Sequence, residues 1–231
     1  MTYSDLANEF APYFTLSEEQ LKQLEQYCHL LQEWNKVMNL TAITEESDVI
    51  EKHFYDCLIP AKSSCFKGNT ILDVGTGAGF PGLVFAIAFP DKKVVLVDAT
   101  AKKCKFLNEV SKELGLKNVM VVNKRAEDLN DRDHFDIVTA RAVAPLPILL
   151  EITAPFAKVH GCVLAMRGEK GEEELASSHR AISLLDLHLV EKKVDELPGN
   201  TGKRVNIFFE KGVKTQKRFP RSWAEIHAHP L

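Results

Sequence analysis

Cysteine is scarce in this sequence, and it lacks long apolar segments and an excess of charge. Its five cysteines are odd in number and form no C-x-x-C pair, so neither a disulfide framework nor a zinc site is indicated. The longest apolar run, Leu83 to Phe89, is far too short to span a bilayer. No basic stretch followed by an apolar core opens the chain, so no secretory signal is expected. We therefore expect a cytoplasmic protein with reduced thiols, no membrane anchor and no metal.

The charge balance excludes a general attraction to nucleic acid. The 29 lysines and arginines are outnumbered by 32 acids, so the formal net charge is −3 and any polyanion must bind to a local patch. One such patch is the tail, residues 212–231, whose cations have no acid between them: Lys214, Lys217, Arg218 and Arg221. Within it, Phe219 either stacks on a base or packs on the domain. We expect this tail to lie apart from the ligand crevice, which forms at strand ends in another segment.

The stretch T-I-L-D-V-G-T-G-A-G-F-P-G, residues 70–82, is the one around which we expect the domain to be organised. Residues 71–74 form a short β-prone apolar run, four glycines follow within eight residues, and residues 83–89 suit a helix. Glycine tolerates positive φ and lets a ligand lie against the main chain. Strand, glycine turn and helix together predict the opening of a nucleotide-binding βαβ unit.

Two classes of cofactor use such an opening, and two residues favour one of them. Gly77-x-Gly79-x-x-Gly82 fits the dinucleotide pattern. However, Pro81 lacks the backbone N–H that a pyrophosphate would bind, and Asp73 would repel it. A cationic ligand without phosphate, such as S-adenosylmethionine, suits Asp73 better.

A second acid supports the site. The next apolar strand, residues 93–98, ends in Asp98, whose carboxylate is placed to accept hydrogen bonds from ribose hydroxyls. The alternative is that Asp98 caps the following helix. Because Thr100 is equally able to cap that helix, we favour the ribose role.

The pattern of elements predicts three regions: a helical N-terminal extension (1–62), an α/β domain with a parallel sheet (63–211) and the basic tail (212–231). In the extension, Ser17 and Gln20 form a capping box. A second helix is expected from Ser47 to Ile59, where His53 and Asp56 lie three residues apart and could pair. His53 has either a structural role or a role in contacting the substrate. Further strands are expected at 119–122, 135–138, 162–166, 187–194 and 204–209, with helices at 146–156 and 172–185.

Several motifs together identify a family. They are W-N-K-x-x-N-L-T at 34–41, His53-x-x-Asp56, D-V-G-T-G-x-G-x-P-G at 73–82, Asp98 with Lys102-Lys103 behind it, Arg125-Ala126-Glu127, Arg141-Ala142-Val143 and K-R-F-P-R at 217–221. With them the chain resembles, over nearly its whole length, the RsmG (GidB) family of bacterial 16S ribosomal RNA guanine-N7 methyltransferases. One departure is Arg167, which stands at the end of the fifth strand where a lysine is usual.

The resemblance implies a class I S-adenosylmethionine-dependent methyltransferase fold, a Rossmann-like α/β domain with a seven-stranded, mostly parallel sheet. It also implies S-adenosylmethionine as cofactor, 16S rRNA or the small ribosomal subunit as partner, and a monomer. The cofactor contacts expected from the residues and the resemblance are Asp73, Gly75, Gly77, Phe80, Asp98, Ala126, Glu127 and Arg141. The substrate contacts expected are Asn39, His53, Lys217, Arg218 and Arg221. Arg141 holds the methionine carboxylate or an RNA phosphate, with a structural ion pair as the alternative.

The chemistry agrees independently with transfer to guanine N7. The place after the fourth strand lacks the Asn/Asp/Ser-Pro-Pro-aromatic signature of amino-group methyltransferases, and no cysteine follows a proline as in many cytosine-C5 enzymes. N7 of guanine carries no proton, so its methylation needs alignment and no general base. Alternatives are a small-molecule methyltransferase, a non-catalytic RNA-binding module that keeps the fold, and, least favoured, a nicotinamide oxidoreductase.

Overall fold

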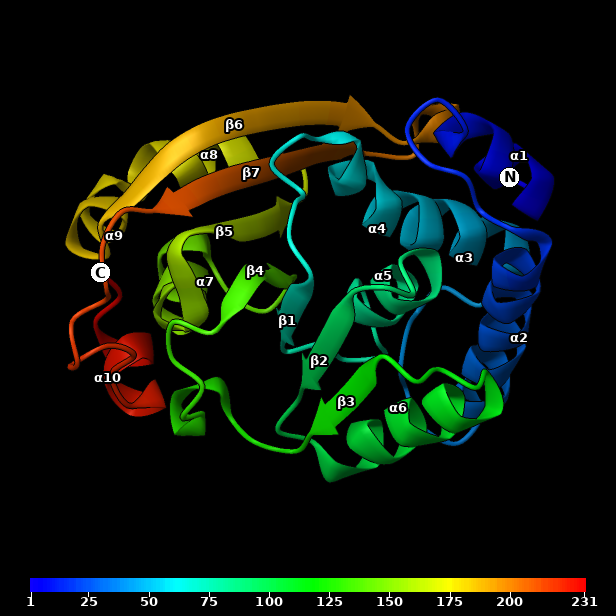
Figure 1. Ribbon diagram of the computed structural model, residues 1–231, viewed down its shortest axis with the longest axis horizontal. Coiled ribbons are helices and arrows are strands. Elements are labelled where there is room, and N and C mark those ends of the chain that lie inside the picture. The colour runs from blue at the N-terminus through cyan, green and yellow to red at the C-terminus, as the bar shows by residue number, and fades with distance from the viewer.

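A computed structural model describes all 231 residues and contains one seven-stranded sheet (Figure 1). The strands are β1 (Thr70–Val74), β2 (Lys93–Val97), β3 (Val119–Val122), β4 (Phe135–Arg141), β5 (Ala157–Arg167), β6 (Leu187–Glu196) and β7 (Lys203–Lys211). Their order is β3-β2-β1-β4-β5-β7-β6, and only β7 runs antiparallel to both of its neighbours. The predicted seven-stranded, mostly parallel sheet is therefore confirmed. The strand order reverses between β1 and β4, which places the ligand crevice at the carboxyl ends of these two strands.

Helices cover both faces of the sheet, and each layer has its own apolar core. On one face lie α1 (Tyr3–Phe10), α2 (Glu18–Asn35), α3 (Glu46–Val49), α4 (Asp56–Leu58), α5 (Gly82–Ala88) and α6 (Ala101–Glu113). On the other lie α7 (Leu146–Thr153), α8 (Gly171–Ser177), α9 (His179–Leu184) and α10 (Trp223–Ala228). Alternation along β1 sends Ile71 into the first core and Leu72 into the second.

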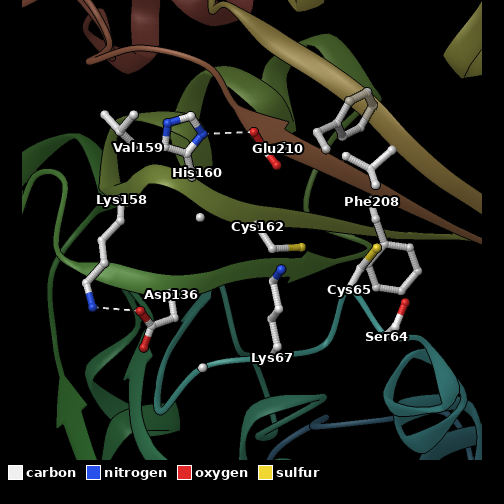
Figure 2. A pocket seen from close by; sticks show the side chains of 14 residues that line it. Ser64, Cys65, Lys67, Asp136, Lys158, Val159, His160, Cys162, Phe208 and Glu210 are labelled. Carbon is white, nitrogen blue, oxygen red and sulfur yellow. Dashed lines mark hydrogen bonds and ion pairs between the residues drawn. The ribbon is translucent and has the colours of Figure 1, made fainter.

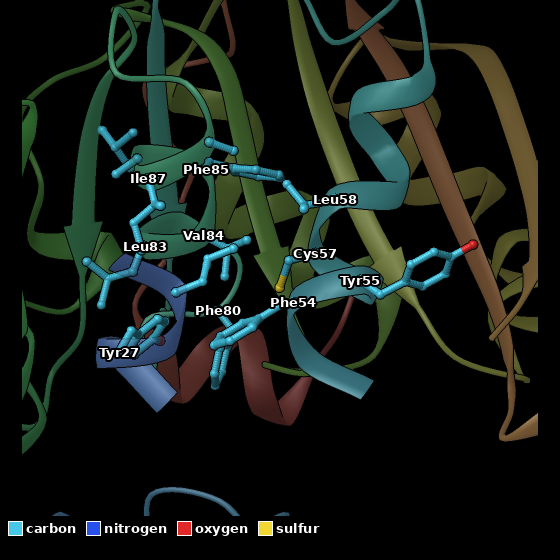
Figure 3. Packing of buried hydrophobic residues seen from close by; sticks show 14 of the residues in the cluster. Tyr27, Phe54, Tyr55, Cys57, Leu58, Phe80, Leu83, Val84, Phe85 and Ile87 are labelled. Atoms are coloured by element: carbon cyan, nitrogen blue, oxygen red, sulfur yellow. The ribbon is translucent and has the colours of Figure 1, made fainter. Parts of the chain in front are cut away.

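The N-terminal helices form part of the first core and are not a detached extension. The predicted capping box at Ser17 and Gln20 begins α2, and α2 buries Tyr27 on the side facing the sheet. Figure 3 shows Tyr27, Phe54 and Phe80 gathered beside α5. Their ring centroids are 5.5 Å apart for Tyr27–Phe54 and for Tyr27–Phe80. The glycine turn is thus packed directly against the N-terminal layer.

The helix expected at 47–59 is longer and less regular than its sequence indicates. The helical segment runs from residue 46 to 62 and contains a π-helical turn at Ile50–Tyr55 between α3 and α4. Pro60 lies inside a final 3₁₀ turn, Ile59–Lys62, instead of ending the helix. Such π turns are rare, appear mostly as single turns inside α-helices and are frequent at functional sites. Here the turn carries His53 and is followed directly by Asp56, and both side chains are buried.

Two further elements differ from expectation. The fourth strand continues to Arg141, because it pairs with β5 as far as Met166. The helix expected at 172–185 is broken into α8 and α9 at Ser178. The Ser178 hydroxyl donates to the carbonyl of Glu174, a local bond that competes with regular helix geometry. No helix of the structure is both long and apolar enough to cross a membrane.

The C-terminal segment is docked on the second helical layer. Phe219 is 2% exposed and packs on the domain, which decides between the two roles considered for it. Arg132 donates to the carbonyl oxygens of Thr215 and Phe219. Arg221 donates from Nε and Nη2 to the fully buried carboxylate of Glu151, at 2.8 and 2.6 Å. Of the four tail cations, Arg221 is therefore engaged internally, whereas Lys214, Lys217 and Arg218 are exposed.

We expect Arg221→Ala to lower the free energy of unfolding by about 3 kcal/mol, because it leaves the Glu151 carboxylate buried without its partner. The matched control is Arg218→Ala, an exposed position where the change should stay within about 0.5 kcal/mol. Urea unfolding of both variants tests this. Equal stability of the two variants would contradict a docked C-terminal segment.

Candidate functional site

The turn after β1 is fixed by backbone bonds to β2. The amides of Gly75 and Thr76 both donate to the Val97 carbonyl, at 2.8 and 3.0 Å. Gly77 has φ +61°, and the nearest atom to a Cβ placed there is 3.9 Å away. At Gly82 a Cβ would lie 2.2 Å from the Leu96 side chain. Gly82 is thus required by packing, whereas Gly77 presents an open backbone surface of the kind that a ligand can approach.

Asp73 lies entirely beneath this turn. Its Oδ2 accepts a hydrogen bond from the Gly82 amide at 2.8 Å, and its Oδ1 is buried without a partner. Burial raises the pKa of Asp73 to about 6, and the bond from Gly82 opposes that rise. The first amide of α5 is therefore already bound to a carboxylate. A pyrophosphate would find neither that amide free nor a favourable charge.

A cavity of about 170 Å³, here the Asp98 cavity, opens beside the turn. It brings together four of the predicted cofactor contacts, Gly75, Asp98, Ala126 and Glu127, from the ends of three different strands. Apolar side chains, Val143 among them, complete its walls. The sequence-based expectation that these four residues share one site agrees with their placement.

The Asp98 carboxylate joins the turn to the start of α6. Its Oδ2 accepts from the Gly77 amide at 3.0 Å and its Oδ1 from the Thr100 amide at 2.8 Å. Thr100 occupies the N-cap position of α6, and its side chain makes no capping bond. A carboxylate offers about four lone-pair directions, so about two remain for the hydroxyls of a ribose. Asp98 is consequently not the N-cap of α6, and it keeps acceptor capacity toward the cavity.

Arg141, at the end of β4, is bound by two residues of the N-terminal layer. Its Nη1 donates to Asp56 Oδ2 at 2.9 Å, and its Nη2 lies 3.0 Å from His53 Nδ1. Its guanidinium also lies 5.0 Å from the centre of the Phe80 ring. The spacing of His53 and Asp56 allowed them to pair with each other, but each is instead bound to Arg141. The structural ion pair considered for Arg141 is present.

The bonds around His53 determine its protonation. Because arginine has only donors, His53 Nδ1 must accept, so the proton lies on Nε2 and points to Thr41 Oγ1, 2.9 Å away. Burial, with the nearby charge of Arg141, lowers the pKa of His53 to about 3. The imidazole is stacked on Phe80 at 4.3 Å and is neutral at physiological pH. It is already hydrogen-bonded on both nitrogens, as a structural histidine would be.

A second cavity, here the basic cavity, lies on the other side of the loop after β4. It has a volume of about 420 Å³, and Ala142 lines it, whereas the next residue, Val143, lines the Asp98 cavity. Four cations line the basic cavity together with His53 and a single acid, Asp56; the cations are Lys52, Arg141, Arg167 and Arg204. Asp56 is shared, since Arg204 Nε also lies 3.0 Å from its Oδ1. Lys52 is also paired, with Asp48 at 2.9 Å, but the four cations still outnumber the acids that bind them.

Three cations of this cavity, Lys52, Arg167 and Arg204, were not predicted from the sequence, and Arg167 is the most informative of them. Its side chain is 9% exposed, and its Nη2 is paired with Glu174 at 2.5 Å. Its Nε and Nη1 are buried without any partner. Buried guanidinium groups are normally fully paired, so two nitrogens without a partner are unusual and make Arg167 a candidate for binding an anionic or oxygen-rich ligand. The signal in the sequence was its position at the carboxyl end of β5, next to the β4 end.

Other predicted residues lie elsewhere. Asn39 is exposed in the loop after α2 and does not line the basic cavity, whereas Asn35 holds that loop by accepting from the amides of Leu40 and Thr41. The Phe80 ring is 6% exposed and packs in the first core. The tail was expected to lie apart from the crevice, and this was wrong: Trp223 lines the Asp98 cavity.

A third cavity, of about 560 Å³, lies away from both of these, between the segment before β1, the start of β5 and the end of β7 (Figure 2). Figure 2 shows Lys67 and Cys162 pointing toward each other across it. Burial raises the pKa of the Cys162 thiol to about 12, so it stays protonated. The polar pairs that line it, Lys158–Asp136 and His160–Glu210, are satisfied internally. None of the predicted site residues lines this cavity.

Comparison with known proteins decides the family. The model of the rRNA small subunit methyltransferase G (GidB) family matches residues 20–199. The chain belongs to this family. A relative named ribosomal RNA small subunit methyltransferase G from Staphylococcus epidermidis is 44% identical over 220 residues, covering 94% of this chain and 92% of the relative. The protein of the same name from Staphylococcus aureus is 41% identical over 236 residues, covering 100% and 99%.

Solved structures agree with the fold. A TYW2 protein from M. jannaschii, crystallised in complex with AdoMet, superposes with a TM-score of 0.57 at 19% identity, over 74% of this chain and 79% of that one. Like the rRNA small subunit methyltransferase G family itself, this neighbour supports a class I methyltransferase architecture. The resemblance read from the motifs is therefore confirmed.

We expect Asp98→Ala to weaken binding of S-adenosylmethionine at least about tenfold, because two hydrogen bonds to a charged group are lost. Lys103→Ala is the control, since Lys103 Nζ lies 3.8 Å from Asp98 Oδ2 and makes only a loose pair. Calorimetry on both variants measures the dissociation constants. An unchanged constant for Asp98→Ala would leave Asp98 a purely structural role.

We expect His53→Gln to change how stability depends on pH. Below about pH 6.5 the unfolded chain protonates His53 while the folded chain, with its pKa near 3, does not, so the wild type loses stability as pH falls. Between pH 7 and pH 5 the variant should gain about 2 kcal/mol relative to wild type, and between pH 8 and pH 7 nothing. Urea unfolding at the three pH values tests this. Parallel curves throughout would mean that His53 titrates normally in the fold.

Proposed function

We propose that the protein transfers a methyl group from S-adenosylmethionine to N7 of one guanosine in 16S ribosomal RNA. The observation that carries this proposal is the pair of cavities flanking the loop after β4. One has a carboxylate with free acceptor capacity, and the other has four cations with two unpartnered donors on Arg167. Family membership supplies the substrate class. A 16S rRNA substrate supports a cytoplasmic protein, and we propose that location together with the monomer expected from the resemblance.

The residues of the Asp98 cavity fit S-adenosylmethionine. Asp98 can accept from ribose hydroxyls, and the apolar wall with Ala126 suits an adenine; Gly77, whose amide binds Asp98 beside the cavity, leaves the backbone open to close approach. The unpartnered Oδ1 of Asp73 lies beneath the turn, where its charge favours a cationic ligand. When bound there, S-adenosylmethionine supplies an electrophilic methyl group on a positively charged sulfur.

The basic cavity would hold the target nucleotide. Lys52, Arg167 and Arg204 can neutralise phosphate charge, and the free N–H groups of Arg167 can donate to phosphate or base oxygens. The N7 lone pair of guanine forms the new bond to the methyl carbon as the sulfur–carbon bond breaks, so the positive charge moves from sulfur to the base. No proton leaves, and alignment is the main contribution of the protein. His53, bonded on both nitrogens, agrees with a reaction that uses no base.

The absence of a general base predicts a simple pH–rate profile. The rate of methyl transfer is measured against pH under single-turnover conditions with saturating cofactor. If no side chain acts as a base, replacing any one Asp, Glu, His, Cys or Lys of the two cavities should not remove an inflection from this profile. Quenched-flow measurements from pH 6 to 9 on the wild type, His53→Gln and Lys52→Gln test it. An inflection lost in one of these variants would point to a base and contradict N7 transfer.

We expect Arg167→Gln to weaken binding of small ribosomal subunits and to flatten its salt dependence by about 0.7–0.9 in the slope of log K against log salt, one phosphate contact. The control is Lys217→Gln, on the exposed part of the tail, where RNA contact was also expected from sequence. Unchanged affinity for S-adenosylmethionine shows that Arg167→Gln is folded. A larger effect of Lys217→Gln than of Arg167→Gln would move the RNA site to the tail.

A further inference from the structure

The C-terminal helix contributes a tryptophan to the Asp98 cavity. Trp223 is the first residue of α10 and lines this cavity together with Asp98, Ala126 and Glu127. Helix α10 contacts α7. The Trp223 side chain is partly exposed. It is thus an aromatic surface at the wall of a ligand cavity, supplied by a segment that follows the lining strand ends Val74 and Val97 by more than 100 residues.

Several interactions hold Trp223 in this place. Two residues earlier, Arg221 makes three hydrogen bonds to Glu151 on α7, from its backbone amide and from two guanidinium nitrogens. The residue after Glu151 is Ile152, which lines the same cavity as Trp223. Two consecutive residues of α7 therefore have two roles: Glu151 binds the C-terminal segment and Ile152 lines the cavity. This one helix sets the position of Trp223 relative to the cavity.

The far side of Trp223 is fixed as well. Ser222 and Glu225 form a capping box that begins α10, and Ile226 is fully buried against the second core. The ring of His227 lies 6.2 Å from that of Trp223. A tryptophan with a purely structural role would be packed by protein atoms on all sides. Trp223 instead borders a cavity of about 170 Å³.

We propose that Trp223 is a cofactor-binding residue and contacts the adenine of S-adenosylmethionine. This inference rests on the proposed placement of the cofactor in the Asp98 cavity. A purine offers a flat π face and few charges, and an indole matches it with a large apolar surface at little cost in side-chain entropy. Val143 and Ile152 are among the other apolar residues that line the cavity. The C-terminal segment thus belongs to the cofactor site as well as to the surface of the protein.

The chain allows a direct spectroscopic test, because it has two tryptophans. Trp34→Phe leaves Trp223 as the single reporter. Trp223→Phe leaves Trp34, which lies on α2 and donates to Glu109 on α6. Titration with S-adenosylhomocysteine, which cannot transfer a methyl group, should change the emission of the Trp223-only variant to saturation. The Trp34-only variant should respond little.

Affinity gives the second measurement. Trp223→Ala should weaken binding of S-adenosylmethionine by about tenfold, the loss expected for one aromatic stacking partner, and Trp223→Phe by less. This inference alone would be overturned if the emission of Trp223 did not change in protein that binds the cofactor by calorimetry. Wild-type affinity in Trp223→Ala would overturn it as well. No heat from the wild-type protein with S-adenosylmethionine would overturn the cofactor assignment itself.

Discussion

The site depends on the buried guanidinium of Arg141. It extends from the end of β4 into the N-terminal layer, where it is held by Asp56 and His53 and lies over Phe80 of the glycine turn. This one side chain connects the sheet, the turn and the helices that cover them. A buried charge of this kind costs much to desolvate, so it persists because its hydrogen bonds are satisfied. The two cavities of the site lie on either side of the loop that follows it.

Acidic and basic side chains are separated on the two sides of Arg141. Beneath the turn, Asp73 is a buried acid whose Oδ1 has no hydrogen-bond partner. Beside it, Asp98 faces the smaller cavity. Beyond Arg141, the basic cavity gathers four cations around one acid. A cationic cofactor and a polyanionic substrate would each meet the complementary sign, and their reacting atoms would meet at the boundary between the cavities. This separation explains how a chain with net charge −3 can still attract RNA.

Local signals in the sequence were sufficient for much of this. The glycine turn, the capping box at Ser17 and the acid ending β2 are all encoded by neighbouring residues, and their places were predicted correctly. Features that depend on distant packing were missed. The π turn carrying His53, the arginine between His53 and Asp56 and the free donors of Arg167 arise only when β4, β5 and the N-terminal layer meet.

The tail shows the same limit most clearly. Its basic composition predicted RNA contacts and a place apart from the crevice, but composition cannot report that Arg221 would bind a buried acid on α7 or that Trp223 would reach the Asp98 cavity. The N-terminal motif is similar: Asn39 was expected at the substrate, and the structure instead gives Asn35 the bonds that shape the loop. In both cases the residue types pointed to a polar or basic segment, but the sequence did not show which residues they would contact.

The central claim is methyl transfer to a single guanine N7 in 16S rRNA. It is tested most directly by incubating the protein with radiolabelled S-adenosylmethionine and small ribosomal subunits that lack the modification, and then mapping the labelled nucleotide. Label confined to one guanosine of 16S rRNA and released as 7-methylguanosine is the expected result. Label on another atom or another RNA, or no incorporation by protein that binds the cofactor, would contradict the claim.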